Sequence, residues 1–311
     1  MNKLFISDIC NGGVKGHANY NFVDVDVHHD NLLFIDPVKL ELAEDEWSIN
    51  ASNVVNNYFD AFYSAYANND RDLILELLAH AHEINATCLG YGTRVNGKGN
   101  TELGLLQKFD PIGHLIKNIK TIGKPEDLKV LLPEFAEDGL SDMLTNILHD
   151  QLNEFTVREM KKYGIEAEKH ISFWTWSSRD GKWILVDRPS VLVNGKEILL
   201  VPKWIVRKQY LVSTDQFFKR IILERMREEG NYYHEDGKPM TKKEIMKSKR
   251  FSGEHWLYKE TIDYTSENND ALAEYHKQLP LFYQDDIADV DEYLDRMLGD
   301  TERDGITTIE C

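Results

Sequence analysis

The sequence predicts an α+β protein that is mostly helical, with an N-terminal strand pair and a central antiparallel sheet built from hairpins. Three observations predict this class. Apolar residues recur at helical spacing over long stretches, apolar/polar alternation is confined to short segments, and Asp180-Gly181 and Asn194-Gly195 are strong turn signals. With 311 residues, of which 42% are hydrophobic and 29% charged, the chain can bury a sizeable core without disulfides.

Strands are expected in two regions. Residues 21–27 alternate apolar and polar side chains, and residues 32–37 form an apolar run that stops at a proline. Apolar segments over residues 170–186 and 191–201 flank the two glycine turns, whose residues tolerate positive φ. We therefore expect an antiparallel sheet across about residues 170–207.

Helical periodicity occupies most of the remaining chain. Ser48 and Asp70 are suitable N-caps for two core helices, and the longest helix is expected between Asp138 and Gly164. Further helices are expected over residues 101–109, 111–122 and 214–229, then up to about residue 279, and over 287–298.

The expected organisation is a single α+β core over residues 1–284, with a subdivision near residue 124 as an alternative. An acidic C-terminal tail follows over residues 285–311.

Charge and hydropathy limit the functional classes. The 36 basic and 53 acidic residues give a net charge of −17, which repels nucleic acid and anionic membranes at long range. Any nucleic-acid contact must therefore be local. No stretch approaches the roughly 20 apolar residues of a membrane helix, and the three cysteines form no metal-ligand or disulfide pattern. We expect a cytoplasmic protein without membrane contact.

A glycine-rich loop spans residues 92–99. It has the GxxxxGK spacing of a phosphate-binding loop, but Gly99 replaces the Ser or Thr that binds magnesium. A helix rather than a strand is expected before it, which favours a flexible loop over a nucleotide site. Lys98 is a candidate phosphate contact.

Polar residues follow one side of the longest expected helix: Asp138, Asp142, Asn146, His149 and Asn153. Carboxylates one turn apart can hold Mg²⁺ or Mn²⁺, so Asp138 and Asp142 are candidate metal ligands. The alternative is the solvent face of an amphipathic helix.

The expected sheet carries part of a nuclease pattern. Metal-dependent nucleases of the PD-(D/E)xK type place an Asp and a (D/E)xK tripeptide on adjacent strands. Asp187 and Lys203 fit, but the tripeptide is Val201-Pro202-Lys203, so Asp142 would have to supply the second carboxylate. Asp142, Asp187 and Lys203 are the candidate catalytic residues; exposed residues at a sheet edge are the alternative, which Pro202 favours.

The only extended basic zone follows this sheet. Its candidate contacts with phosphate or with an acidic partner are Arg207, Lys208 and Arg220.

Four segments together resemble a family of largely uncharacterised bacterial proteins encoded among anti-phage defence genes. The segments are Phe34-Ile35-Asp36-Pro37, Leu89-Gly90-Tyr91-Gly92, Asp138-Gly139-Leu140-Ser141-Asp142 with Thr145-Asn146-Ile147, and Leu199-Leu200-Val201-Pro202-Lys203 with Ile205-Val206-Arg207. The resemblance implies a setting rather than a mechanism, and it adds weight to the Asp138/Asp142/Asn146 and Lys203/Arg207 clusters.

Two functional hypotheses follow. The first is a component of a defence system that acts on nucleic acid as a metal-dependent, nuclease-like effector. The second is a non-catalytic sensor, scaffold or inhibitor that binds a protein partner or forms a homo-oligomer. Nucleotide binding at residues 92–99 is a third, weaker option.

Overall fold

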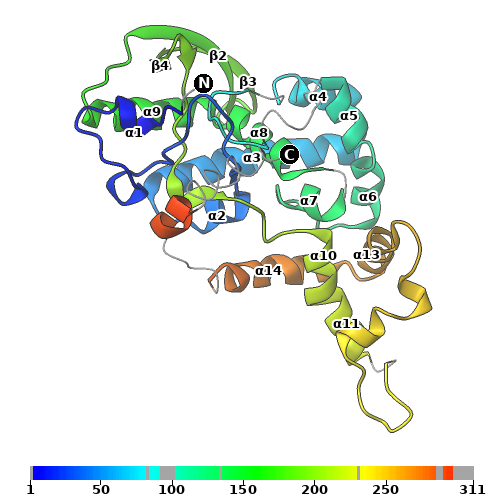
Figure 1. Cartoon of the computed structure of the whole chain (residues 1–311). Coiled ribbons are helices and arrows are strands. Elements are labelled where there is room, and N and C mark those ends of the chain that lie inside the picture. Colours follow the sequence, from blue (N-terminus) through cyan, green and yellow to red (C-terminus); the bar gives the residue numbers. More distant parts are fainter. Residues whose placement is uncertain are drawn as a thin grey trace, which may run out of the picture.

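The computed structural model describes residues 3–81, 84–91, 102–132, 135–229, 232–284 and 290–296. Helices dominate, and the strands form three separate two-stranded antiparallel sheets (Figure 1). The predicted α+β class is confirmed. Within the described ranges, none of the helices combines the length and the hydrophobicity that crossing a bilayer requires.

The helices are α1 (Ile6–Ile9), α2 (Pro37–Leu42), α3 (Glu46–Asn68), α4 (Arg71–Leu78), α5 (Glu102–Phe109), α6 (Ile112–Asn118), α7 (Asp127–Leu131), α8 (Glu137–Ile147), α9 (His149–Lys162), α10 (Thr214–Phe217), α11 (Leu223–Glu228), α12 (Lys242–Ile245), α13 (Trp256–Glu267) and α14 (Asp270–Gln284). A π-helical turn, Phe218–Ile222, joins α10 to α11. Residues 290–296 form one more helical segment.

Capping side chains set where two central helices begin. The Asp45 carboxylate accepts a bond from the Ser48 amide, so α3 begins before the predicted cap. Asp70 accepts from the Leu73 amide and caps α4, as predicted. The 23-residue α3 is longer than either helix in the 138–164 region.

The predicted continuous helix from Asp138 to Gly164 is wrong, because the chain breaks at Leu148 into α8 and α9. Leu148 is fully buried with φ −95° and ψ 14°. The hydroxyl of Thr175 donates to the Ile147 carbonyl at 3.3 Å and accepts from the Asp150 amide at 3.2 Å. Thr175 therefore bonds to backbone groups that lose their helical hydrogen-bond partners at the break. Helix α9 packs against the β2–β3 hairpin.

The two predicted hairpins are confirmed. Strands β2 (Lys169–Ser177) and β3 (Lys182–Ser190) pair antiparallel, as do β4 (Leu192–Val193) and β5 (Lys196–Glu197). Asn194 and Gly195 both have positive φ, 53° and 80°, as a tight hairpin turn requires. The hairpins remain separate sheets instead of joining into one.

The N-terminal segments do not pair with each other. Strand β1 (Phe34–Ile35) pairs with β6 (Val206–Arg207), whereas residues 21–27 form no strand and make isolated bridges at Phe22 and Asp26. Strand β1 and Phe22 thus find their partners far along the chain, whereas Asp26 bridges to Phe5. The pairing of β1 with β6 brings the segment after β6 against β1.

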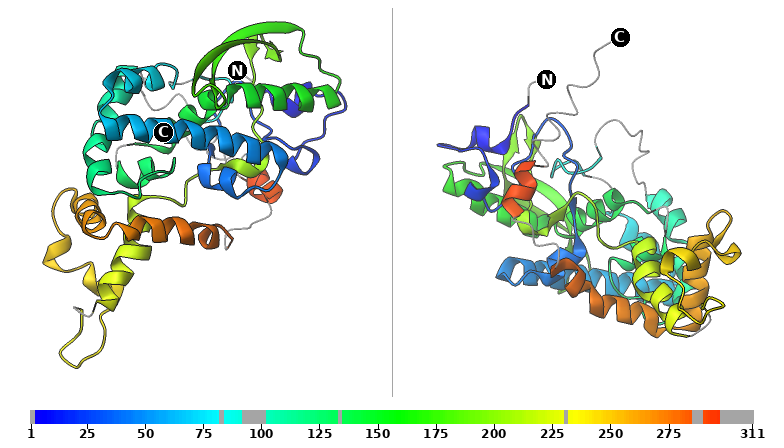
Figure 2. Two further views of the ribbon diagram at one scale, coloured as in Figure 1. Left: turned by 180° about the vertical axis from the view of Figure 1, so that it is seen from behind. Right: turned by 60° about the horizontal axis from the view of Figure 1, so that its bottom comes forward.

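Buried hydrophobic side chains form one connected cluster that includes residues from Ile6 to Leu294. Helix α3 packs against α2, α4, α6 and α8, and α14 packs against α2 and the π-helical turn. Figure 2 shows the loop over residues 232–241, in yellow, projecting away from this body. The boundary at residue 284 stays a prediction.

Candidate functional site

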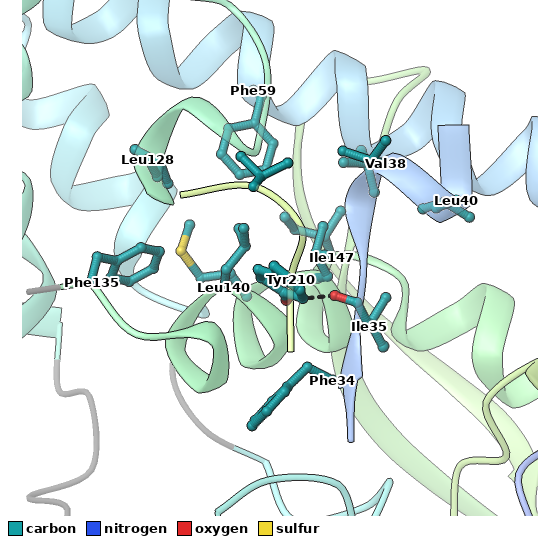
Figure 3. Packing of buried hydrophobic residues seen from close by; sticks show 14 of the residues in the cluster. Phe34, Ile35, Val38, Leu40, Phe59, Leu128, Phe135, Leu140, Ile147 and Tyr210 are labelled. Atoms are coloured by element: carbon teal, nitrogen blue, oxygen red, sulfur yellow. Dashed lines mark hydrogen bonds between the residues drawn. The ribbon is translucent and has the colours of Figure 1, made fainter. Parts of the chain in front are cut away.

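Three distant segments meet around the buried Phe34 ring. Its centroid lies 4.8 Å from that of Tyr91 and 6.3 Å from that of Tyr210. The Tyr210 hydroxyl donates to the Ile35 carbonyl at 2.6 Å, the bond drawn in Figure 3. The Ile35 amide donates to the Ser141 hydroxyl of α8 at 3.0 Å. Strand β1 therefore joins residues 89–91, the start of α8 and the segment after β6.

A pocket of about 490 Å³ opens at this junction. It combines two cations, one carboxylate and three tyrosines. Its lining consists of Leu32, Tyr91, Glu137, Arg207, Lys208, Gln209, Tyr210, Leu211 and Tyr293.

Glu137 is the carboxylate in the lining. It accepts a hydrogen bond from the Tyr91 hydroxyl at 2.7 Å and lies 3.2 Å from the Lys129 ammonium. Burial alone would raise the pKa of Glu137, but the Tyr91 and Lys129 contacts outweigh it and lower that pKa. Glu137 is therefore ionised near neutral pH, and its charge is already shared with Lys129.

The candidate metal ligands Asp138 and Asp142 are outside the lining, and each acts on a residue in it or next to it. Gly90 has φ +143°, and a Cβ on it would stand 2.8 Å from Oδ1 of Asp138. Only glycine allows this approach of backbone to carboxylate. The charge of Asp142, with those of Asp36 and Glu137, helps to hold the pKa of the buried Tyr210 well above its usual range, after burial itself.

Arg207 is held in place by contacts with three residues. Its Nε donates to the Gln209 carbonyl at 3.1 Å and lies 3.9 Å from Oδ2 of Asp36, and its guanidinium lies 5.6 Å from the centroid of the Tyr283 ring. Burial raises the pKa of Asp36, against the opposing effects of Tyr283 and Arg207. These contacts hold Arg207 at the pocket.

Lys208 is exposed at the same place, and its backbone amide donates to the Tyr293 hydroxyl at 2.9 Å. The structure thus places two sequence-predicted residues, Arg207 and Lys208, in the lining, and a third, Asp138, against Gly90, the neighbour of the lining residue Tyr91.

Three other predicted residues have partners elsewhere. The Asp187 carboxylate is exposed on the β2–β3 hairpin, where it bonds Nδ1 of His170 at 2.5 Å and the Ser172 hydroxyl at 3.2 Å. The first of these bonds is the main reason that the pKa of Asp187 is lowered. Lys203 donates to the His17 carbonyl at 2.8 Å and pairs with Asp291 at 2.5 Å.

Arg220 also lies away from the pocket lining. It donates to Gln216 at 2.9 Å, and its guanidinium lies 3.9 Å from the centroid of the Phe282 ring. Lys98 and the rest of the glycine-rich loop fall outside the described residues. Among the residues with described positions, no three His, Cys, Asp or Glu side chains gather as a metal site.

Sequence reasoning missed Tyr91, Glu137 and Tyr293 as site residues. Tyr91 lies in the segment Leu89-Gly90-Tyr91-Gly92, which carries the family resemblance, and Glu137 directly precedes the candidate metal ligand Asp138. Their position in the sequence next to predicted residues was the only signal that could have indicated them. Tyr293 lies in the acidic tail and gave no signal.

The sequence model of a domain family of unknown function, DUF8370, matches residues 13–213, about two thirds of the chain. The chain belongs to the DUF8370 family. Neither the curated proteins nor the solved structures contain a match. The DUF8370 domain supplies every pocket-lining residue except Tyr293.

Proposed function

We propose that the DUF8370 domain binds a phosphate-bearing ligand of nucleotide size in this pocket, as a component of bacterial anti-phage defence in the cytoplasm. The observation that carries the ligand class is the presence of Arg207 and Lys208 in the same lining as the half-exposed Tyr91. Guanidinium and ammonium groups recognise phosphate oxygens, and tyrosine rings stack on bases. The defence setting rests on the sequence resemblance.

The dimensions of the pocket support a small ligand. Its volume of about 490 Å³ falls within the roughly 300–1,000 Å³ of typical small-molecule sites. A nucleotide or the phosphorylated end of a nucleic acid fits this range. A long duplex would instead need an extended basic surface, which the net charge of −17 disfavours. Local recognition therefore suits this protein better than tracking along a polymer.

A metal-dependent nuclease is the second candidate function. The observation that favours it is the position of Asp138 against Gly90, the neighbour of the lining residue Tyr91, together with the effect of the Asp142 charge on the lining residue Tyr210. Magnesium is commonly held by one or two carboxylates together with substrate phosphates, so Mg²⁺ or Mn²⁺ arriving with the ligand needs no third protein carboxylate. Binding is preferred to catalysis because Asp187 and Lys203 bond to residues outside the pocket lining.

We also propose that the protein works with a protein partner or as a homo-oligomer. The hairpin surface supports this, because the cross-strand neighbours Trp174 and Leu185 are 41% and 58% exposed. Aromatic and aliphatic side chains left in water at one place are typical of contact surfaces.

Calorimetric titration with a 5′-phosphorylated DNA trinucleotide tests the ligand proposal. We expect binding that requires the 5′-phosphate and weakens by roughly tenfold or more in Lys208→Glu, because a charge-assisted hydrogen bond is lost and a repulsion is added. Repeating the titration with ATP separates a free nucleotide from a nucleic-acid end, and adding EDTA shows whether Mg²⁺ contributes.

The matched control is Lys238→Glu, which makes the same charge change at a lysine that is 79% exposed and paired with Asp236 in a distant turn. It should leave the affinity unchanged. Equal affinity for the phosphorylated and unphosphorylated trinucleotide, or equal loss in both variants, would contradict the proposal.

A further inference from the structure

The helical segment 290–296 lies against the DUF8370 domain although it is far from it in sequence. Asp291 pairs with Lys203 at 2.5 Å. Asp295 accepts from the backbone amide of His17 at 3.0 Å and contacts Nδ1 of the same residue at 2.6 Å. Figures 1 and 2 show this segment, in red, beside the blue N-terminal loop.

The contacts come from one face of the segment. Residues 291, 294 and 295 lie on the same side of a helix because they are three or four positions apart. Leu294 is fully buried and packs in the hydrophobic cluster. The segment is thus held by one apolar anchor between two carboxylates.

His17 presents two hydrogen-bond donors to a carboxylate. It is 2% exposed, and its Nε2 accepts a hydrogen bond from the Asp24 amide at 3.0 Å. Nε2 is therefore unprotonated and Nδ1 carries the hydrogen that points at Asp295. The backbone amide and the ring N–H of one residue form a two-donor site for an anionic oxygen.

The segment also enters the pocket. Tyr293 lines the pocket, and its hydroxyl accepts a hydrogen bond from the backbone amide of Lys208. A phosphate oxygen in the pocket would use the same donor. The three acidic side chains Asp291, Glu292 and Asp295 outnumber the single Arg296. A negatively charged segment therefore occupies one donor of the site that we assign to a negatively charged ligand, the Lys208 amide, and its contacts with Lys203 and His17 outside the lining hold it there.

We propose that residues 290–296 are a detachable intramolecular ligand that competes with the phosphate-bearing ligand for this edge of the pocket. The inference rests on the proposed function. In the docked state Asp291 pairs with Lys203, Asp295 bonds to His17, and Leu294 is buried in the hydrophobic cluster. Release of the segment leaves the Lys208 amide free to bind the ligand. Ion pairs at a partly exposed surface weaken with salt, so release is favoured at high ionic strength as well as by ligand.

Two measurements on the full chain test this regulation. Hydrogen–deuterium exchange reports docking, and titration with the 5′-phosphorylated trinucleotide reports affinity. In Asp291→Lys, which places two ammonium groups together, we expect amides 290–296 to exchange at least about tenfold faster and the trinucleotide to bind about fivefold tighter. In the wild-type chain, saturating trinucleotide should speed exchange in the same amides.

Controls separate docking from general effects of charge. Glu254→Lys makes the same charge change at a side chain that is 88% exposed, and it should alter neither exchange nor affinity. The reversed pair Lys203→Glu with Asp291→Lys should restore slow exchange, because the attraction is re-formed with opposite signs.

The outcomes distinguish the two proposals. Equal trinucleotide affinity in the wild type and Asp291→Lys, or unchanged exchange on ligand binding, overturns the competition while leaving the ligand site standing. Absence of binding in both chains overturns the proposed function and the competition with it. Tighter binding in Asp291→Lys supports both.

Discussion

The hydroxyl of Tyr283 donates a 2.8 Å hydrogen bond to Oδ2 of Asp36, a residue 247 positions earlier in the chain. Asp36 is 1% exposed, and its other oxygen accepts from the Val38 amide and so caps α2. One carboxylate therefore fixes the start of α2, the end of α14 and, at 3.9 Å, Arg207. The pocket depends on α14 although the family match ends at residue 213.

Tyr283→Phe should lower stability by about 1–3 kcal/mol, because it removes a hydrogen bond from a buried carboxylate and leaves one lone pair unsatisfied. Urea unfolding measures the loss. Tyr233→Phe, at a residue that is 51% exposed, is the control and should change little. A stability equal to that of the wild type would show that another donor replaces the Tyr283 hydroxyl.

Gly90→Ala should destabilise the fold by about 1–3 kcal/mol, because alanine is strained at φ +143° and its Cβ would stand 2.8 Å from Asp138. Displacing Asp138 should also weaken binding in the pocket. Gly123→Ala is a matched control, since no atom lies within 4 Å of its added Cβ and its φ is not positive. Thermal unfolding of both variants makes the comparison; equal losses would refute the steric explanation.

Stability should fall as pH rises from about 5 to 9. Burial raises the pKa of Glu126 from 4.5 to about 8. The contribution of Glu126 to the free energy of unfolding is therefore complete below pH 4.5 and is lost as pH rises through about 8. Burial would lower the pKa of His276, but Asp127, 2.6 Å away, raises it from 6.5 to about 9. The contribution of His276 is complete below pH 6.5 and is lost through about 9.

Glu126→Gln separates these two contributions, because glutamine stays neutral over the whole range. The variant should lose less stability than the wild type between pH 5 and pH 8, measured by chemical unfolding at each pH. Glu254→Gln, at an exposed side chain, should follow the wild-type curve. Parallel curves for wild type and Glu126→Gln would mean that Glu126 ionises as readily in the folded state as in the unfolded chain.

Divalent metal tests the second candidate function. With the 5′-phosphorylated trinucleotide present, Mg²⁺ or Mn²⁺ at tenfold its Kd should stabilise the wild type by about 1.4 kcal/mol, or about 2–4 °C in Tm, and Asp142→Ala should lose this shift. Asp215→Ala, which removes a carboxylate on α10 that pairs with Lys219 of the π-helical turn, is the control. An identical shift in Asp142→Ala would exclude Asp142 as a ligand.

Part of the site was accessible from the sequence. Asp138, Asp142, Arg207 and Lys208 were singled out by spacing and charge. The structure places Arg207 and Lys208 in one pocket lining and Asp138 against Gly90, the neighbour of the lining residue Tyr91. Lys203 carries the same charge signal but pairs with Asp291, because residues 290–296 dock against it. A charge pattern indicates which residues could bind an anion, and it contains no information about which of them the fold has already neutralised.

The sequence by itself determined the local structure: the α+β class, the two hairpins at Asp180-Gly181 and Asn194-Gly195, and the cap at Asp70. These features depend on interactions between residues a few positions apart, which a sequence displays directly. Only the tertiary structure decided the break at Leu148 and the meeting of Tyr91, Glu137, Arg207 and Tyr293. Such contacts join distant segments through shared packing and buried hydrogen bonds, and no local pattern records which partner each segment finds.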